Sequence, residues 1–207
     1  RYRVYMRYHA IAFDFDGTLA QNGVVSTSTR EALDRLSHSG RRCLMVTGRR
    51  LEELITTPED LSPFEYVVAE NGAVLYCPES KDTTDLSEPL PTTFVDELRK
   101  RGVERMEVGH VIVATWTPYE QIAFEVIKEL KLELQLIFNK GAVMVLPAGV
   151  NKGTGLAHAL RAMKLSRHNV IGIGDAENDH SLFAGCEVSV AVSNSLPELK
   201  ERADFVT

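Results

Sequence analysis

The stretch that decides the fold is AIAFDFDGT, residues 10–18. Four apolar residues are followed directly by two aspartates, a glycine and a threonine. A short apolar run that ends in polar residues is typical of a buried parallel strand that leads into a loop. The stretch therefore predicts a strand over residues 10–13 with Asp14 and Asp16 at its carboxyl end, the edge at which open α/β sheets bind ligands.

Three later apolar runs end in small or polar residues in the same way. They cover residues 43–46, 66–69 and 169–173. Segments with apolar residues at helical spacing lie between the runs, and the first of them is predicted to start at Ser28, where Ser28 and Glu31 match a capping box. This alternation predicts an α/β fold with a doubly wound parallel sheet.

The alternation stops in the middle of the chain. Residues 78–93 are rich in Pro, Ser, Thr and Asp, which indicates a linker or an exposed loop. Two helical and four strand patterns follow, and Asn139-Lys140-Gly141 marks a hairpin between the last two strands. We therefore expect a core domain formed by residues 1–76 and 148–207, interrupted by a small α+β domain of residues 77–147, called the insert below.

Asp14 and Asp16 carry the first chemical signal. Carboxylates this close repel each other unless a cation or a shared proton lies between them, and oxygen ligands suit Mg²⁺. Gly17 allows backbone N–H groups to approach an anion. The alternative for this segment is a plain Asp-Gly turn after a strand.

A second acidic segment follows the strand over residues 169–173. Asp175, Asn178 and Asp179 lie within five residues, and acids in such a cluster are costly to bury unless they bind a metal. A dinucleotide-binding loop is the alternative, but Glu177 stands where the last glycine of that pattern is required. This segment therefore also predicts a metal site.

Two further segments offer groups that suit a phosphate. Thr47, Gly48 and Arg49 follow the second strand and supply a hydroxyl, a backbone N–H and a guanidinium. Lys152 begins a helix, where the helix dipole disfavours a cation unless an anion is held there as well. The structural alternative for residues 47–49 is a helix cap followed by a surface arginine. The structural alternative for Lys152 is a solvated lysine.

Together these four segments resemble the motifs of the haloacid dehalogenase-like superfamily: Asp-x-Asp-Gly-Thr, a strand-end Thr or Ser, a Lys, and Gly-Asp-x-x-x-Asp. The resemblance covers the whole chain, and the insert lies between the second and third motifs, as in the Cof-like branch with a type-II cap. The compact insert is similar to the caps of archaeal phosphoglycolate phosphatase and sucrose-phosphate phosphatase. The resemblance implies a Rossmann-like core domain with an inserted α+β cap domain.

The resemblance also implies a role for each motif residue. Asp14 is the expected nucleophile that forms an aspartyl phosphate, and Asp16 the acid and base that serves the leaving alcohol and the water. The implied ligands of Mg²⁺ are Asp14, Asp16 through its backbone carbonyl, Asp175, and Asp179 either as a ligand or as a partner of the ligands. The implied phosphate and substrate contacts are Thr47, Gly48, Arg49, Asn71, Lys152 and Asn178.

The expected reaction is magnesium-dependent hydrolysis of a small phosphomonoester of the phosphoglycolate or sugar phosphate class. Two alternatives stay open: a phosphotransferase or mutase that passes the phosphoryl group to an alcohol, and a non-catalytic regulatory domain of a larger protein that contains an ATPase. Trp116 is expected in the core of the insert. Lys140, on the predicted hairpin, is expected to be exposed rather than to close over the site.

Composition restricts the partners. The 207 residues carry 29 acids and 23 strong bases, and this net charge of -6 disfavours nucleic acid. No apolar run reaches the roughly 18 residues of a membrane helix, and the three cysteines, without metal-ligand spacing, fit a reducing compartment. We expect a cytoplasmic monomer or dimer that acts on a small phosphorylated metabolite, either alone or fused to a further domain. Residues 1–5 precede Met6, a candidate natural start.

Overall fold

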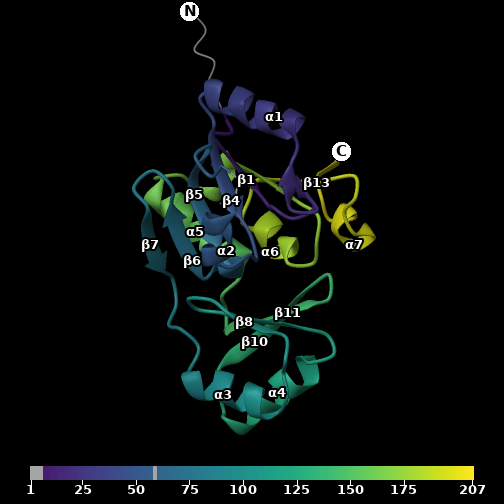
Figure 1. The fold of residues 1–207 in the computed structure, drawn as a ribbon. Coiled ribbons are helices and arrows are strands. Elements are labelled where there is room, and N and C mark those ends of the chain that lie inside the picture. The colour runs from purple at the N-terminus through teal and green to yellow at the C-terminus, as the bar shows by residue number, and fades with distance from the viewer. Residues whose placement is uncertain (1–6, 58–59) are drawn as a thin grey trace, which may run out of the picture.

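The computed structural model describes residues 7–57 and 60–207, so the proposed start at Met6 lies outside the described residues. The core domain surrounds a large sheet, and the insert surrounds a smaller one (Figure 1). Within the described residues the large sheet has the strand order β14-β13-β12-β1-β4-β5-β6-β7. Its parallel strands are β1 (Ala10–Phe13), β4 (Arg42–Val46), β5 (Phe64–Ala69), β12 (Val170–Gly174), β13 (Val188–Ala191) and β14 (Phe205–Val206).

Helices cover both faces of the large sheet, as a doubly wound fold requires. Ile11 and Phe13 of β1 pack in one apolar cluster with α1 and α2, and Ala10 and Ala12 pack in another with α5 and α6. Because both faces of β1 are buried, its sequence is continuously apolar. The core helices are α1 (Thr27–His38), α2 (Leu51–Thr56), α5 (Lys152–Ala162), α6 (Asp179–Ala184) and α7 (Pro197–Lys200), with the 3₁₀ turns η1 (Glu70–Gly72) and η2 (Arg167–Asn169). The predicted α/β fold is confirmed.

The insert forms a sheet with the strand order β10-β11-β9-β8. Its elements are α3 (Thr92–Lys100), β8 (Met106–Val108), β9 (Val113–Trp116), α4 (Glu120–Glu129), β10 (Leu134–Asn139) and β11 (Ala142–Pro147). Helices α3 and α4 cover one face, and the other face turns toward the core domain (Figure 1). The predicted hairpin is confirmed: Asn139 pairs with Ala142, and Lys140 and Gly141 both have positive φ, as a type I′ turn requires.

The predicted loop over residues 78–93 is wrong in part. It contains β7 (Asp82–Asp85), which pairs with β6 (Val74–Cys77) as the antiparallel edge of the large sheet. All four residues of β7 are exposed and none is apolar, so no alternation marks them as a strand. From this pairing we propose that the insert begins after β7 rather than at residue 77.

The start of α1 also differs from the prediction. Ser26 is the N-cap, and its Oγ accepts a hydrogen bond from Thr29 N (3.1 Å). The helix therefore begins at Thr27, and Ser28 is not the cap of the predicted capping box. A hairpin of β2 (Ala20–Gln21) and β3 (Val24–Val25) precedes the helix and was not predicted. The residues between these strands, Asn22-Gly23, are a turn signal that would have found it.

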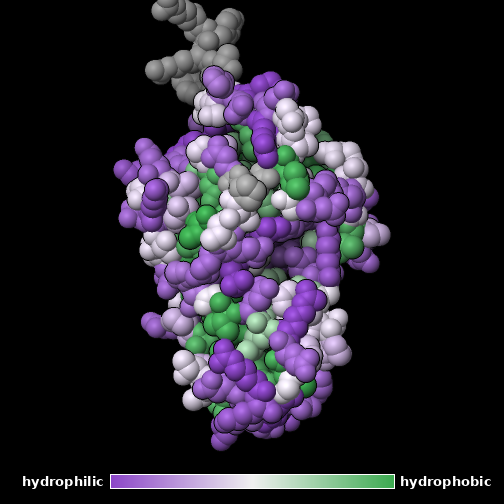
Figure 2. Space-filling view, viewed as in Figure 1, coloured by the Kyte–Doolittle hydropathy of each residue, from purple (hydrophilic) through white to green (hydrophobic). Residues whose placement is uncertain are grey.

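The core domain and the insert face each other at the carboxyl ends of the parallel strands. Figure 2 shows a recess between them with hydrophilic residues around it. Across residues 7–57 and 60–207, each helix is too short or too polar to cross a bilayer.

Candidate active site

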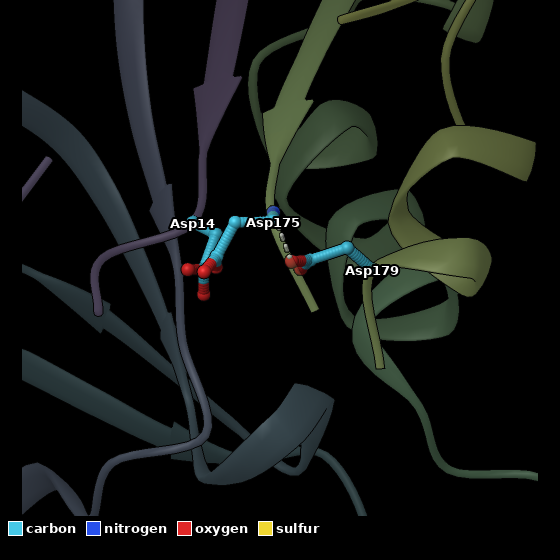
Figure 3. Close-up of side chains that lie close together, drawn as sticks. All are labelled: Asp14, Asp175 and Asp179. Carbon is cyan, nitrogen blue, oxygen red and sulfur yellow. Dashed lines mark hydrogen bonds between the residues drawn. The ribbon is translucent and has the colours of Figure 1, made fainter. Parts of the chain in front are cut away.

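Three buried carboxylates lie together where β1 and β12 end. Asp14 follows β1, Asp175 follows β12 and Asp179 begins α6, and ligand oxygens of the three lie within 4.8 Å of one another. Figure 3 shows the side chains of Asp14 and Asp175 close together, with Asp179 directed at the backbone of Asp175. Two motifs 160 residues apart thus meet as one acid cluster.

The strand register explains this convergence. β1 lies between β12 and β4, and Phe13 pairs with Ile173. Asp14 N donates to Ile173 O (2.9 Å), which holds the loop after β1 beside the loop after β12. Gly17 has a φ of +89°, and a Cβ there would lie 2.2 Å from Asp175 Oδ2. Only glycine allows the two loops to approach this closely.

Asp179 supports the cluster through its hydrogen bonds. Its Oδ2 accepts from the backbone N–H groups of Asp175 (2.8 Å) and Ala176 (3.0 Å), and its Oδ1 accepts from Lys152 Nζ (2.6 Å). Both carboxylate oxygens therefore already have donors. Of the two roles left open for Asp179, this geometry favours the partner that orients the ligands over the ligand itself.

Lys152 is the first residue of α5, and its side chain is fully buried. Its Nζ donates to Asp14 Oδ1 (2.5 Å) and to Asp179 Oδ1 (2.6 Å). Burial lowers the pKa of Lys152, but the carboxylates of Asp14 and Asp179 outweigh this effect and raise that pKa above its usual value. The alternative of a solvated lysine is thereby excluded, and Lys152 is a fixed positive charge beside Asp14.

The acid cluster fits a divalent cation. Burial raises the pKa of Asp14, and the neighbouring Asp179 and Asp175 add to the rise, whereas Lys152 opposes it. A cation bound by Asp14 and Asp175 would compensate the negative charge of this buried cluster, and hard oxygen donors of this kind are the ligands Mg²⁺ prefers. The donor set is therefore consistent with a metal site.

Asp16 is held away from the acid cluster by Arg49. Arg49 Nε and Nη2 donate to the two oxygens of Asp16, each at 2.7 Å, and a further nitrogen pairs with Glu53 at 3.0 Å. The guanidinium also lies 4.9 Å from the centre of the Phe15 ring. Arg49 is thus mostly buried, which argues against the alternative of a helix cap followed by a surface arginine. The Asp16 carboxylate is not among the three that form the acid cluster.

Thr47 and two asparagines complete the side of the site next to β4 and β5. Thr47 is buried, and its Oγ1 accepts from Arg49 N (3.1 Å). Asn178 Nδ2 donates to Asn71 Oδ1 (3.0 Å), while Asn71 Nδ2 and Asn178 Oδ1 are buried without a partner in the described part of the chain. Buried amide atoms without partners are rare and suit a ligand that supplies the missing bonds.

A cavity of about 260 Å³ opens from these residues toward the insert. Its core-domain lining includes the predicted site residues Asp14, Asp16, Thr47, Gly48 and Arg49. Its lining from the insert is Glu107, Ala114, Trp116, Asn139, Ala142 and Met144. The recess between the two domains in Figure 2 is thus a site to which both contribute.

Two residues of the insert lie elsewhere than predicted. Trp116 lines the cavity, with the Arg105 guanidinium 3.6 Å from its ring centre, and it is not part of the apolar core of the insert. Lys140, at the turn of the β10–β11 hairpin, forms an ion pair with Asp175. Because Val113 and Thr115 are the buried residues of β9, strand alternation places Trp116 on the opposite face, and this signal could have found its position. The length of a lysine side chain gives Lys140 a reach that the hairpin signal does not predict.

The comparisons with known proteins identify the class. A model of the haloacid dehalogenase-like hydrolase family matches residues 11–115 and 108–207. The chain therefore belongs to the haloacid dehalogenase-like hydrolase family, and the predicted classification as a phosphatase of this type is confirmed.

Within the family, the chain is similar to archaeal phosphoglycolate phosphatases, as the sequence predicted. It is 30% identical to the phosphoglycolate phosphatase of Methanothermobacter thermautotrophicus, over 96% of this chain and 91% of that protein. It is 27% identical to phosphoglycolate phosphatase 2 of Saccharolobus solfataricus, over 95% of this chain and 84% of that protein. A solved haloacid dehalogenase-like hydrolase from Bacteroides thetaiotaomicron has the same fold, with a TM-score of 0.79 at 21% identity over 97% of this chain and 94% of that one.

Proposed function

We propose that the chain hydrolyses a small phosphomonoester through an aspartyl phosphate on Asp14, with Mg²⁺ as cofactor. The observation that carries the proposal is the position of Asp14, which lines the cavity while its carboxylate contacts Lys152 and lies beside Asp175. A carboxylate in this setting can act as a nucleophile toward phosphorus because the surrounding positive charge holds the phosphate close to it.

In the first step an oxygen of Asp14 attacks phosphorus, the bond from phosphorus to the leaving oxygen breaks, and Asp16 gives that oxygen a proton. In the second step Asp16 takes a proton from water, the water oxygen attacks phosphorus, and the bond to Asp14 breaks. Inorganic phosphate is released, and both aspartates return to their starting states. Asp16 must carry a proton in the first step, and its carboxylate must be free of the two hydrogen bonds from Arg49 to reach the leaving oxygen.

The other residues of the site would bind and orient. Asp14, Asp175 and the backbone carbonyl of Asp16 would hold Mg²⁺, which neutralises charge on the phosphoryl oxygens when bound. Lys152 and the Thr47 hydroxyl would bind the transferred phosphoryl group, together with the N–H of Gly48 and the guanidinium of Arg49. Asn71 and Asn178 would use their unpartnered amide atoms for the substrate or for ligand orientation.

The volume of the cavity supports a small molecule as the substrate. Its volume of about 260 Å³ has room for a phosphate ester with a short polar leaving group, and its lining is rich in charged and polar side chains. Phosphoglycolate, for which the relatives are named, and the smaller sugar phosphates both meet this description. We propose this class as the substrate.

The test is phosphate release from a panel of phosphoglycolate, small sugar phosphates and larger nucleotides, each with Mg²⁺ and with EDTA. We expect release that requires Mg²⁺ and is fastest with phosphoglycolate or a small sugar phosphate. Product analysis with added sugar alcohols separates hydrolysis from transfer to an alcohol. Release that is unaffected by EDTA, or binding of every compound without turnover, would contradict the proposal.

A further inference from the structure

Glu70 is a fully buried carboxylate that the proposed reaction does not use. It lies in η1, directly after β5, and its side chain points to the insert rather than to the acid cluster. Its Oε1 accepts from the backbone N–H of His110 (2.9 Å), and its Oε2 accepts from those of Val111 (2.9 Å) and Ile112 (3.1 Å). A single side chain of the core domain therefore binds three successive N–H groups of the β8–β9 turn, residues 109–112.

The β8–β9 turn is built to fit this carboxylate. A Cβ at Gly109 would lie 2.5 Å from Glu70 Oε1, so a larger residue there would push the turn off Glu70. The His110 ring nitrogens lie 2.8 Å from Glu52 and 3.2 Å from Asp85, both in the core domain. Arg50 Nε pairs with Glu107 (3.1 Å) just before the turn. The contacts around Glu70 thus join the β8–β9 turn and the adjoining strand β8 to the core domain.

Glu70 itself belongs to the η1 turn, and this turn also contacts the segments that carry the acid cluster. Glu70, Asn71 and Gly72 have successive positive φ values of 51°, 55° and 106°, a conformation that costs energy for the two residues other than glycine. Asn71 bonds to Asn178, which precedes Asp179. A Cβ at Gly72 would lie 2.0 Å from Asn151 O, directly before Lys152. This strained turn therefore contacts the insert, the loop after β12 and the start of α5 at once.

We propose that Glu70 is a positioning residue that fixes the insert over the acid cluster. By holding the β8–β9 turn, Glu70 sets the position of β9, whose last residue, Trp116, lines the cavity opposite Asp14. A carboxylate with three N–H donors forms strong bonds, and its loss would leave buried N–H groups without acceptors. The kinetic part of the test below rests on the proposed function, and the spectroscopic part does not.

The chain contains one tryptophan, so the intrinsic fluorescence of Trp116 reports directly on this interface. Two variants disturb the contact from opposite sides. Glu70→Gln places an amide NH₂ against the N–H groups of the turn, and Gly109→Ala crowds the unchanged carboxylate. Glu79→Gln is the matched control, because it removes the same charge from an exposed position on the core domain.

In both variants we expect a red-shifted emission and stronger acrylamide quenching of Trp116, with Glu79→Gln like wild type. For the best substrate of the panel we expect KM to rise about tenfold while kcat changes less, because the insert is displaced while Asp14 is untouched. The affinity for Mg²⁺ measured by calorimetry should change by no more than about fivefold, because the acid cluster lies within the core domain and Lys140 of the insert is a half-exposed partner of one of its carboxylates.

Folded variants whose Trp116 emission and quenching equal those of wild type would overturn the positioning role. If circular dichroism shows that Glu70→Gln does not fold, Gly109→Ala decides, because it leaves every core-domain residue unchanged. If no phosphate ester of the panel were hydrolysed, the proposed function would be contradicted. The quenching experiment would still test whether Glu70 positions the insert.

Discussion

Lys152 occupies the first position of α5, where the helix dipole opposes a cation, and it is nevertheless fully buried. Its ammonium group is compensated by Asp14 and Asp179, both of which lie within hydrogen-bonding distance. Each member of this group would be costly to bury alone, and together they are tolerated because the charges are paired and bonded. The proposed phosphate-binding charge and the proposed nucleophile thus hold each other in position.

Replacing Lys152 with Met should show how much the ammonium group stabilises the two buried carboxylates. Asp14 and Asp179 would remain buried without their counter-charge, which costs about 3–5 kcal/mol and lowers the melting temperature by about 10 °C. Mg²⁺ should recover part of the loss, because it supplies positive charge at the same place. Thermal melting by circular dichroism, in EDTA and in Mg²⁺, measures both effects.

Lys128→Met is the control for this variant, since Lys128 is exposed on α4. If Lys152→Met melts at the temperature of the control in EDTA, the ammonium does not stabilise the acid cluster, and the electrostatic account of the site fails.

At this scale the sequence predicted which residues meet but not how their side chains are oriented. Strand ends follow from apolar runs, so the meeting of Asp14 with Asp175 could be predicted, and the resemblance to the family placed Lys152 in the same site, where it contacts Asp14. The pairing of Asp16 with Arg49 could not, because it depends on the path of the loop after β4. The reach of Lys140 depends on how two domains meet, which no local pattern encodes, whereas the alternation of β9 places Trp116 on the face opposite Val113.

Helix α5 packs closely against the end of β5 and the η1 turn. A Cβ on Gly155 would lie 2.5 Å from both Gly72 Cα and Val68 Cγ1. Alanine usually stabilises a helix relative to glycine, by up to about 1 kcal/mol, but here the overpacking should cost about 1–3 kcal/mol.

We therefore expect Gly155→Ala to destabilise the protein, with a lower urea midpoint and an unchanged m-value. His158→Ala, on the exposed face of the same helix, should leave the midpoint close to that of wild type. A midpoint for Gly155→Ala at or above the wild-type value would show that the helix does not pack against the turn this closely.

The β10–β11 hairpin brings a positive charge to the acid cluster. Because Lys140 pairs with Asp175, its ammonium group competes with a divalent cation for the same carboxylate. Lys140→Met should therefore tighten Mg²⁺ binding by up to about fivefold, a modest effect because the lysine is half exposed.

Isothermal titration calorimetry with Mg²⁺ measures this change, with Lys131→Met as the control for loss of an exposed lysine from the insert. Weaker binding in Lys140→Met than in the control would mean that Lys140 assists the site and does not compete with the cation.

Elements with two buried faces or one buried stripe were predictable, and exposed edges were not. β1 is a continuous apolar run and α5 has an apolar stripe, because the core requires both. β7 pairs with β6 through backbone hydrogen bonds, and its four exposed polar residues match those of a loop. The prediction of a linker there failed for this physical reason.

At the scale of the molecule, the proposed function depends on two domains that share apolar packing where they meet. The insert has an apolar cluster of its own beneath α3 and α4, and Val111, Ile112 and Met144 on its other side belong to a cluster of the core domain. The core domain supplies the acid cluster and Lys152, and the insert supplies the opposite wall of the cavity (Figure 1). The order of the motifs along the chain predicted this division. The contacts that join the domains, such as those of Glu70, have no periodic pattern and became visible only in the structure.

Asp14 is the proposed nucleophile of a magnesium-dependent phosphatase. The most direct test compares the rates of phosphate release from the best substrate in Mg²⁺ by wild type and by Asp14→Asn. Asp14→Asn should fold, because Lys152 keeps its bond to Asp179, and its turnover should fall by about a thousandfold or more. Asp34→Asn, which removes an exposed carboxylate from α1, should behave as wild type. Release by a folded Asp14→Asn sample at a rate near that of wild type would contradict the account.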